Sequence, residues 1–188
     1  MLGSHNSMSY LPPTNVWGKI TRIWNKCQNK DLQGQYDAGA RFFDVRVKLI
    51  NNNWHYVHND ADFGYANISD LKHFFDNHIG CYIRIIYDLR STPTDDEANV
   101  ILTRFNNLIG YIKSDAIAGI TAITYWNWNT TYINKIIKET EYHASVSANA
   151  FQYALGTEWF AKHYNKKALK KYADVRNSEE EVLLIDFV

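Results

Sequence analysis

Apolar and charged residues alternate through residues 40–50, and a period of two predicts a β-strand there. The alternation separates an apolar face from a face that carries charges: Phe43, Val45, Val47 and Leu49 against Phe42, Asp44, Arg46 and Lys48. The cluster Asn51–Asn53 predicts a turn, and residues 54–58 predict a second short strand. The two strands would form either a hairpin or successive elements of a barrel.

Segments with apolar residues every three or four positions alternate with β-prone runs along the chain. The helical segments are 15–38, 67–77, 95–113, 131–138 and 150–173, and the β-prone runs are 81–90, 119–126, 142–147 and 181–188. Within the first segment, Asp31 to Asp37 would form a second short helix that ends at Gly39. Strands that alternate with helices indicate βα units around a mostly parallel sheet. The 188 residues fall short of the roughly 200 that a closed eight-stranded barrel needs. We therefore expect one α/β domain over residues 1–188, with a TIM-barrel-like fold that is reduced or partly open.

Composition narrows the class of protein. Hydrophobic residues make up 46% of the chain and charged residues 21%, which is typical of a globular domain. The 20 basic and 20 acidic residues cancel, so the sequence lacks the positive charge expected of a nucleic-acid-binding protein. Cys27 and Cys81 show no metal-binding spacing. No apolar run approaches the roughly 18 residues of a membrane span and no signal peptide is recognised, so we expect a cytoplasmic or peripheral membrane protein.

Polar residues fall where several predicted strands stop, and catalytic groups in βα folds gather at these carboxyl ends. They are His5 with Asn6, Asp44 with Arg46, His58 with Asn59, Asp88 with Arg90, and Asp186. Two histidines can transfer protons, an arginine can bind a phosphate through its planar fork of donors, and carboxylates can orient both. A lone histidine or a local Asp–Arg pair is more often structural. It is the whole set that favours phosphodiester chemistry.

Four sequence blocks in the first third of the chain resemble the X-domain of phosphatidylinositol-specific phospholipase C, in its small bacterial-type or X-domain-containing form. The blocks are Ser4-His5-Asn6-Ser7, then Trp24 to Gln28 with Asp31-Leu32, Gln35 and Gly39-Ala40-Arg41, then Phe43 to Val47, and finally Tyr56-Val57-His58. The C-terminal Ile185-Asp186-Phe187 is a weaker match. The order and separation of the blocks are similar to those of the family.

The resemblance implies a role for each matching residue. His5 would be the general base on the inositol 2-hydroxyl, and His58 would be the general acid on the diacylglycerol oxygen. Arg46 would bind and stabilise the phosphate. Asp44 would orient the hydroxyl and Arg46, and Asp186 would orient His5. The implied reaction releases diacylglycerol and a cyclic inositol phosphate. Attack by a hydroxyl that is already next to the phosphodiester gains the advantage of proximity.

The resemblance also bears on metal dependence. In the calcium-dependent branch of the family, acidic residues and an asparagine near the first histidine hold the ion. Asn6 matches that asparagine, but Arg46 stands where one acidic ligand would be. A guanidinium repels a cation and can replace its charge, so we expect that no metal or other cofactor is required. The bacterial enzymes usually carry Asp where this chain has Asn6, and an amide gives His58 less charge support, which makes His58 a weaker acid–base group.

Contacts with substrate and membrane are predicted from position. Residues expected to line the substrate site beside the first histidine or at strand ends are Asn6, Arg90, Tyr125 and Trp126. For Arg90 and the two aromatic residues the alternatives are an exposed charge and side chains of the core or its rim. Trp17 and Trp24 are expected membrane contacts, because Trp24 matches a helix that approaches the bilayer in relatives, although an apolar helical stripe is more often core.

Three functions are consistent with the sequence. The leading hypothesis is a metal-independent phosphodiesterase that acts on phosphatidylinositol or a related lipid at a membrane surface. A catalytically weakened protein that binds the lipid head group is the second, and Asn6 together with a short middle region favours it. A different two-histidine phosphodiesterase is the third. The lipid head group and the oligomeric state cannot be deduced from the sequence.

Overall fold

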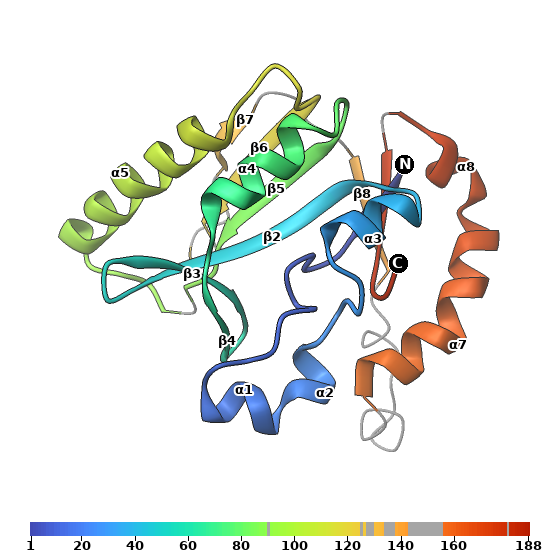
Figure 1. Ribbon diagram of the computed structural model, residues 1–188, viewed down its shortest axis with the longest axis horizontal. Coiled ribbons are helices and arrows are strands. Elements are labelled where there is room, and N and C mark those ends of the chain that lie inside the picture. Colours follow the sequence, from blue (N-terminus) through green and yellow to red (C-terminus); the bar gives the residue numbers. More distant parts are fainter. Residues whose placement is uncertain (90, 125, 127–129, 134–137, 143–155, 180) are drawn as a thin grey trace.

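The structure, a computed structural model, describes residues 1–188 except 90, 125, 127–129, 134–137, 143–155 and 180 (Figure 1). Its strands are β1 (Leu2–Ser4), β2 (Ala40–Ile50), β3 (Asn53–His58), β4 (Ala61–Tyr65), β5 (Tyr82–Tyr87), β6 (Gly119–Thr124), β7 (Thr130–Ile133), β8 (Lys138–Tyr142) and β9 (Glu181–Ile185). Its helices are α1 (Val16–Ile20), α2 (Arg22–Asn25), α3 (Leu32–Asp37), α4 (Ile68–Asp76), α5 (Asp95–Ile112), α7 (Gly156–Lys171) and α8 (Ala173–Asn177).

The strands form one mixed sheet in the order β7-β6-β5-β2-β1-β9-β8, and β3 and β4 extend from β2. Neighbours pair in parallel from β6 through β5, β2, β1 and β9 to β8, whereas β6–β7, β2–β3 and β3–β4 are antiparallel. Within the described residues β7 and β8 stand at opposite ends of this order, so the sheet does not close. The α/β class is confirmed, but the expected barrel with mostly parallel strands is not: the sheet is open and mixed.

The strand β2 crosses the middle of the sheet and connects the core to the charged face. Phe43, Val45 and Val47 are fully buried and pack with side chains of α4 and α5. Asn51 and Asn52 both adopt the left-handed conformation, at φ +49° and +65°, which asparagine tolerates better than most residues. The turn they form sends β3 back along β2, so the two strands make the hairpin, one of the two arrangements that the sequence allowed.

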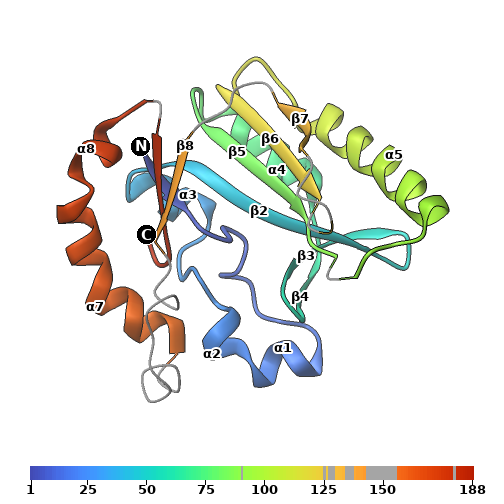
Figure 2. The ribbon, with the colours of Figure 1, turned by 180° about the vertical axis from the view of Figure 1, so that it is seen from behind.

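Different pairs of helices cover the two ends of the sheet. Figures 1 and 2 show α4 against one face of β5 and β6, with α5 beside it, whereas α7 and α8 lie next to β8 and β9. The core between α4, α5 and the sheet is aromatic and aliphatic: Phe43, Phe75, Phe105, Ile83, Ile85 and Ile109. Helix α5 begins with a capping box in which Thr94 and Glu97 satisfy each other's backbone N–H groups. In the described part of the chain no helix is long and apolar enough to cross a membrane.

Several sequence predictions of elements need correction. The helix expected over residues 131–138 is wrong, because β7 pairs with β6 through Thr130–Ile133 and Lys138 begins β8. The sequence Thr-Thr-Tyr-Ile has β-branched and aromatic residues, which suit a pleated strand. In the segment 15–38, α3 agrees with the second short helix expected over Asp31–Asp37, whereas the helix expected before it is divided into α1 and α2. The strand β4 was not foreseen. Residues 143–147 of the expected strand 142–147, and the start of the helix expected over 150–173, lie outside the described residues.

Candidate active site

Three neighbouring parallel strands bring the predicted site residues together. In the sheet β1 lies between β2 and β9, and Ser4, the last residue of β1, is paired with Phe43 on one side and Ile185 on the other. The residues that follow are His5, Asp44 and Asp186, so they meet at one edge of the sheet. The three residues meet, but the prediction that a strand stops at Asp44 and Arg46 is wrong, because both lie inside β2, which continues to Ile50 and into the hairpin.

His5 is held through both ring nitrogens. Its Nδ1 lies 2.6 Å from Oδ1 of Asp186, and its Nε2 lies 2.9 Å from Nη2 of Arg46. Because a guanidinium can only donate, Nε2 accepts from Arg46, and Nδ1 therefore carries the proton that it donates to Asp186. His5 is in this arrangement a neutral imidazole whose basic nitrogen, Nε2, faces the arginine. It is 5% exposed, so little water competes for either contact.

Asp44 is fully buried between two guanidiniums. Its Oδ1 accepts from Nε of Arg84 at 2.9 Å, and its Oδ2 accepts from Nε of Arg46 at 3.3 Å and from the backbone N–H of Asn6 at 3.0 Å. Burial alone would raise the pKa of Asp44, but Arg84 and then Arg46 outweigh it and hold the pKa well below its ordinary value. Asp44 is therefore ionised, and its charge fixes both arginines.

His58, the last residue of β3, faces His5 from the opposite side. The two ring centroids lie 5.7 Å apart, with ring planes at 88°. Nδ1 of His58 lies 2.9 Å from the backbone oxygen of Asn25, to which it donates. Burial, with contributions from Arg46 and His5, lowers the pKa of His58 to about 3. His58 is accordingly neutral at neutral pH.

Some residues of the site were missed in the sequence. Arg84 lies inside β5 directly opposite Asp44, and it is 5% exposed. A charged residue in the middle of the β-prone run 81–90 was the signal that could have identified it. Gln28 was recognised only as part of a matching block, yet its side-chain amide donates to the backbone oxygens of His5 and Ile185. Cys27 was also overlooked, and its Sγ lies 3.8 Å from Nδ1 of His58.

Two of the four predicted substrate contacts, Asn6 and Trp126, lie within the described residues. Asn6 follows His5 with φ +42°, and it is fully buried. Neither polar atom of its side chain has a hydrogen-bond partner among the residues that the structure describes. Trp126 is half-buried and packs on Tyr87 of the core, with ring centroids 5.5 Å apart. Arg90 and Tyr125 lie outside the described residues.

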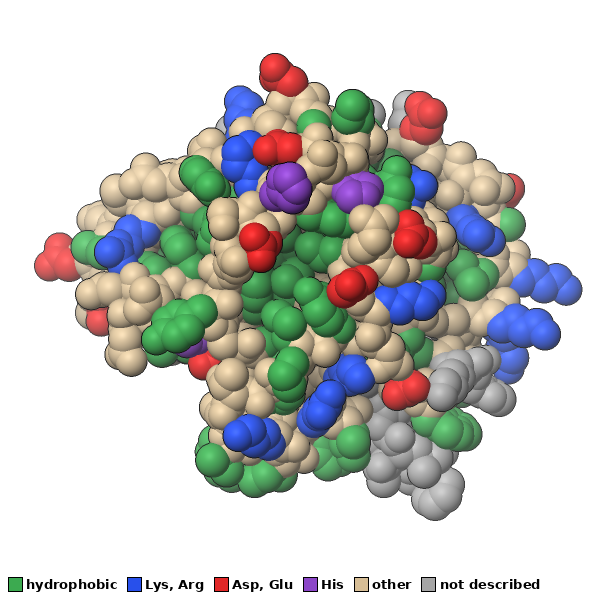
Figure 3. All heavy atoms as spheres, in the orientation of Figure 1, with side chains coloured by type: hydrophobic (Ala, Val, Ile, Leu, Met, Phe, Trp, Pro, Cys, Tyr) green, Lys and Arg blue, Asp and Glu red, His purple; other side chains and the backbone are tan. Residues whose placement is uncertain are grey.

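The apolar stripe of the first helical segment is on the surface. Its members Val16, Trp17, Ile20 and Ile23, named here the α1–α2 patch, are 51–69% exposed. Trp24 is half-buried and is not part of the patch. Of the two tryptophans predicted to contact the membrane, only Trp17 belongs to it. The interpretation of this stripe as core is wrong for the four exposed side chains. Figure 3 shows green and blue side chains together at the base of the molecule, where α1 and α2 lie in Figure 1.

A cavity of about 580 Å³ lies between the α1–α2 patch and the β2–β3 hairpin. Its walls include Trp17 of the patch, Lys48 of β2, and Val57 and Asn59, which flank His58 in sequence. His5, Arg46 and His58 are not among the residues that line it, so the cavity borders β3 beside the candidate active site.

Comparisons with known proteins agree on the fold. No family model and no curated protein sequence matches this chain. Among solved structures, the phosphatidylinositol-specific phospholipase C from Listeria monocytogenes aligns with a TM-score of 0.63 and 14% identity, over 100% of this chain and 87% of that chain. The N254Y/H258Y double mutant of the enzyme from S. aureus aligns with a TM-score of 0.65 and 16% identity, over 100% and 84%. The chain has a fold like that of these phospholipases, and the resemblance to the X-domain family rests on its sequence blocks.

Proposed function

We propose that this chain is a phosphodiesterase that cleaves phosphatidylinositol or a related inositol phospholipid to diacylglycerol and a cyclic inositol phosphate. One observation carries the proposal: two buried histidines face each other at 5.7 Å, and Arg46 lies on the basic nitrogen of one of them. A structural histidine pair has no need of an adjacent phosphate-binding cation. The fold shared with phospholipases of this specificity adds support.

His5 is the general base in this mechanism. Asp186 holds the ring through Nδ1, which directs Nε2 at the site and stabilises the imidazolium that forms when the inositol 2-hydroxyl loses its proton. The hydroxyl oxygen attacks the neighbouring phosphorus, and the bond from phosphorus to the diacylglycerol oxygen breaks. General base catalysis of this kind contributes roughly 10²–10⁴-fold to the rate.

Arg46 supplies the positive charge that stabilises the phosphate as negative charge develops on its oxygens. One oxygen of Asp44 accepts from Arg46 and the other accepts from Arg84. The carboxylate therefore orients the guanidinium of Arg46, while its single negative charge is shared by two cations and a net positive charge remains for the phosphate. Because this cation is built into the chain, the mechanism requires no metal ion.

His58 is the general acid, and it has to be protonated before it can donate to the leaving diacylglycerol oxygen. Its pKa of about 3 means that the proton has to arrive with or after the substrate. The phosphodiester brings a negative charge, which favours the imidazolium and offsets the effect of Arg46. Asn6 gives no such charge, so His58 depends on the substrate for it.

The α1–α2 patch is the proposed membrane contact. Its exposed apolar side chains are accompanied by the exposed cations Lys19 and Arg22, a combination that suits an interface with anionic lipid. The cavity beside Trp17 extends from this patch to Val57 and Asn59, the neighbours of His58 in sequence. The protein would thus take its substrate from the bilayer surface as a peripheral membrane protein.

The test is incubation of the full chain with phosphatidylinositol vesicles in the presence of a chelator, with ³¹P NMR to detect cyclic inositol phosphate. Product is expected with the unaltered chain and with His73→Ala, which changes an exposed histidine of α4. It should disappear in His5→Ala and in Arg46→Ala. Turnover only after calcium is added would refute the metal-independent mechanism.

Head-group binding without turnover is the second candidate, and the neutral state of His58 favours it. Vesicle binding that is weakened in Arg46→Ala, with no product formed by the unaltered chain, would support this candidate over the first. Turnover of a soluble nucleotide or glycerol phosphodiester, with none of the inositol lipid, would instead support a different two-histidine phosphodiesterase.

A further inference from the structure

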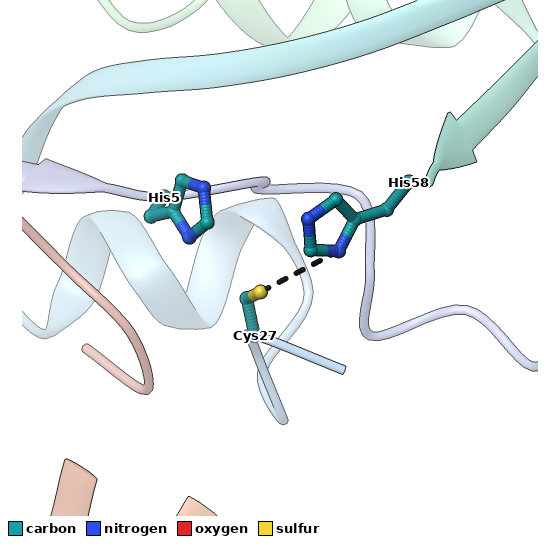
Figure 4. A group of neighbouring side chains, drawn as sticks. All are labelled: His5, Cys27 and His58. Carbon is teal, nitrogen blue, oxygen red and sulfur yellow. Dashed lines mark hydrogen bonds between the residues drawn. The ribbon is translucent and has the colours of Figure 1, made fainter. Parts of the chain in front are cut away.

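Three side chains from separate parts of the sequence converge in the candidate active site: His5, Cys27 and His58 (Figure 4). Each offers one ligand atom, and these atoms all lie within 4.8 Å of one another. All three side chains are buried, and Sγ of Cys27 lies 3.8 Å from Nδ1 of His58. The phosphodiesterase mechanism uses both histidines but gives the thiol no part.

Imidazole nitrogen and thiolate sulfur are the ligands that zinc prefers in proteins. Tetrahedral zinc, with bonds of about 2.0–2.3 Å, holds such atoms about 3.3–3.7 Å apart, so the three groups have to close by about 1 Å. Three protein ligands would leave a fourth position for water. A set of this kind discriminates against calcium and magnesium, which take oxygen ligands.

The surroundings of both histidines match those of metal-binding histidines. Such residues usually donate the other ring N–H to a carboxylate or a backbone carbonyl, which fixes the ring and leaves one nitrogen with its lone pair. His5 meets a carboxylate in Asp186, and His58 meets the carbonyl of Asn25. These contacts leave Nε2 of each ring with its lone pair, whereas the nitrogen of His58 that lies 3.8 Å from the thiol is Nδ1. Coordination together with Cys27 therefore requires the ring of His58 to turn or to release the carbonyl of Asn25.

The local charges both favour and oppose a cation. Asp186 is buried beside the cluster and favours a cation, whereas the charge of Asp44 is already offset by Arg84 and Arg46. The thiol would lose its proton to buffer on coordination, although burial and then Asp186 raise the pKa of Cys27. Arg46 opposes the ion, because its guanidinium lies 2.9 Å from Nε2 of His5 and has to withdraw. Such a site would accept a soft divalent cation in competition with Arg46.

We propose that His5, Cys27 and His58 bind a soft divalent cation of the zinc type, and that this ion inhibits the enzyme by occupying both proton-transfer groups. The inhibition rests on the proposed phosphodiesterase function, whereas the binding does not. Zinc would then be a reversible inhibitor of a site whose reaction needs no metal, and a chelator would remove the ion and restore activity.

Cobalt(II) tests the binding without any reference to activity. Added to the full chain, it should give the near-ultraviolet absorption of a thiolate-to-cobalt charge transfer, and zinc should abolish the band by displacement. Cys27→Ser and His5→Gln should each weaken binding by more than about tenfold. Cys81→Ser is the matched control, since it alters the other buried cysteine, outside the cluster, and should keep the band. In Arg46→Gln, binding of cobalt should tighten.

The inhibition is measured as the zinc concentration that halves turnover of phosphatidylinositol vesicles, each variant being compared with its own rate in chelator. That concentration should rise by more than about tenfold in Cys27→Ser and stay unchanged in Cys81→Ser. The metal site would be overturned if the cobalt charge-transfer band persisted in Cys27→Ser, with circular dichroism showing that Cys27→Ser and Cys81→Ser are both folded. Activation of turnover by zinc would overturn the proposed inhibition. If the unaltered chain turns over no lipid, the phosphodiesterase proposal fails, and cobalt still decides the metal site.

Discussion

Acid should unfold this protein partly through His58. In the folded chain burial lowers the pKa of His58 to about 3, whereas in the unfolded chain the pKa is about 6.5. Between these values the unfolded chain binds a proton that the folded chain does not, so the free energy of unfolding falls as the pH decreases. Each pH unit in this window is worth about 1.4 kcal/mol, and lowering the pH from 6.5 to 4 should therefore cost about 3 kcal/mol from this one group.

The measurement is urea unfolding at a series of pH values from 7 to 4, in chelator, with the unaltered chain and His58→Gln. Carboxylates contribute to both proteins, so the difference between the two curves isolates the histidine. The free energy of unfolding of the unaltered chain should fall by about 3 kcal/mol more than that of the variant over this range. His73→Gln, at an exposed position, should behave like the unaltered chain. If the free energy of unfolding fell in parallel with pH for the unaltered chain and His58→Gln, His58 would take up its proton in the folded state. The conclusion that folded His58 is neutral would then be wrong.

Four further predictions concern the site and its approach to lipid. Asp186→Asn should lower kcat on phosphatidylinositol by roughly 10²–10⁴-fold through loss of the support for His5, with vesicle binding unchanged in a sedimentation assay. Asp44→Asn should lower the free energy of unfolding by about 3–5 kcal/mol, measured in urea, because the buried guanidinium of Arg84 and the partly buried one of Arg46 lose their carboxylate. His58→Ala should reduce turnover strongly with the natural lipid but much less with a nitrophenyl inositol phosphate, whose leaving group needs no proton; an equal loss on both substrates would argue against an acid role. Trp17→Ala should weaken vesicle binding by roughly 10–100-fold, as expected for loss of about 1.5–3 kcal/mol of apolar burial, while hydrolysis of a soluble substrate is retained.

The sequence was most informative where local pattern and pairing agree. Alternation predicted β2 because one of its faces packs in the core. The polar residues at the ends of β1 and β9 meet Asp44 because the parallel register sets Ser4 beside Phe43, although Asp44 lies inside β2. Residues 130–133 were misassigned because their strand character depends on pairing with β6, which no local window contains. Arg84 was passed over for a related reason. Its value as a partner of Asp44 comes from the register between β2 and β5, and register is a property of the sheet.

The exposed α1–α2 patch shows a different limit. Periodicity identifies a helical face that is apolar, but it does not reveal what covers that face. The three short helices of the segment 15–38 turn this stripe to the surface, whereas the same spacing in α4 places Leu71 and Phe75 in the core. Cys27 is a comparable case: it follows α2 in irregular chain, and its nearness to His58 arises only when the segment folds back on the end of β3.

The contacts of Arg46 suggest how one event could prepare both proton-transfer groups. The guanidinium lies on Nε2 of His5, the base of the proposed mechanism, and its charge helps to depress the pKa of His58. In that mechanism a phosphodiester bound to Arg46 would draw the guanidinium away from Nε2 and offset its charge with a negative one. The base is then exposed and the acid is more readily protonated, both as consequences of the same ion pair. A free phosphate-binding arginine elsewhere in the site could stabilise the transition state, but it could not couple the two histidines in this way.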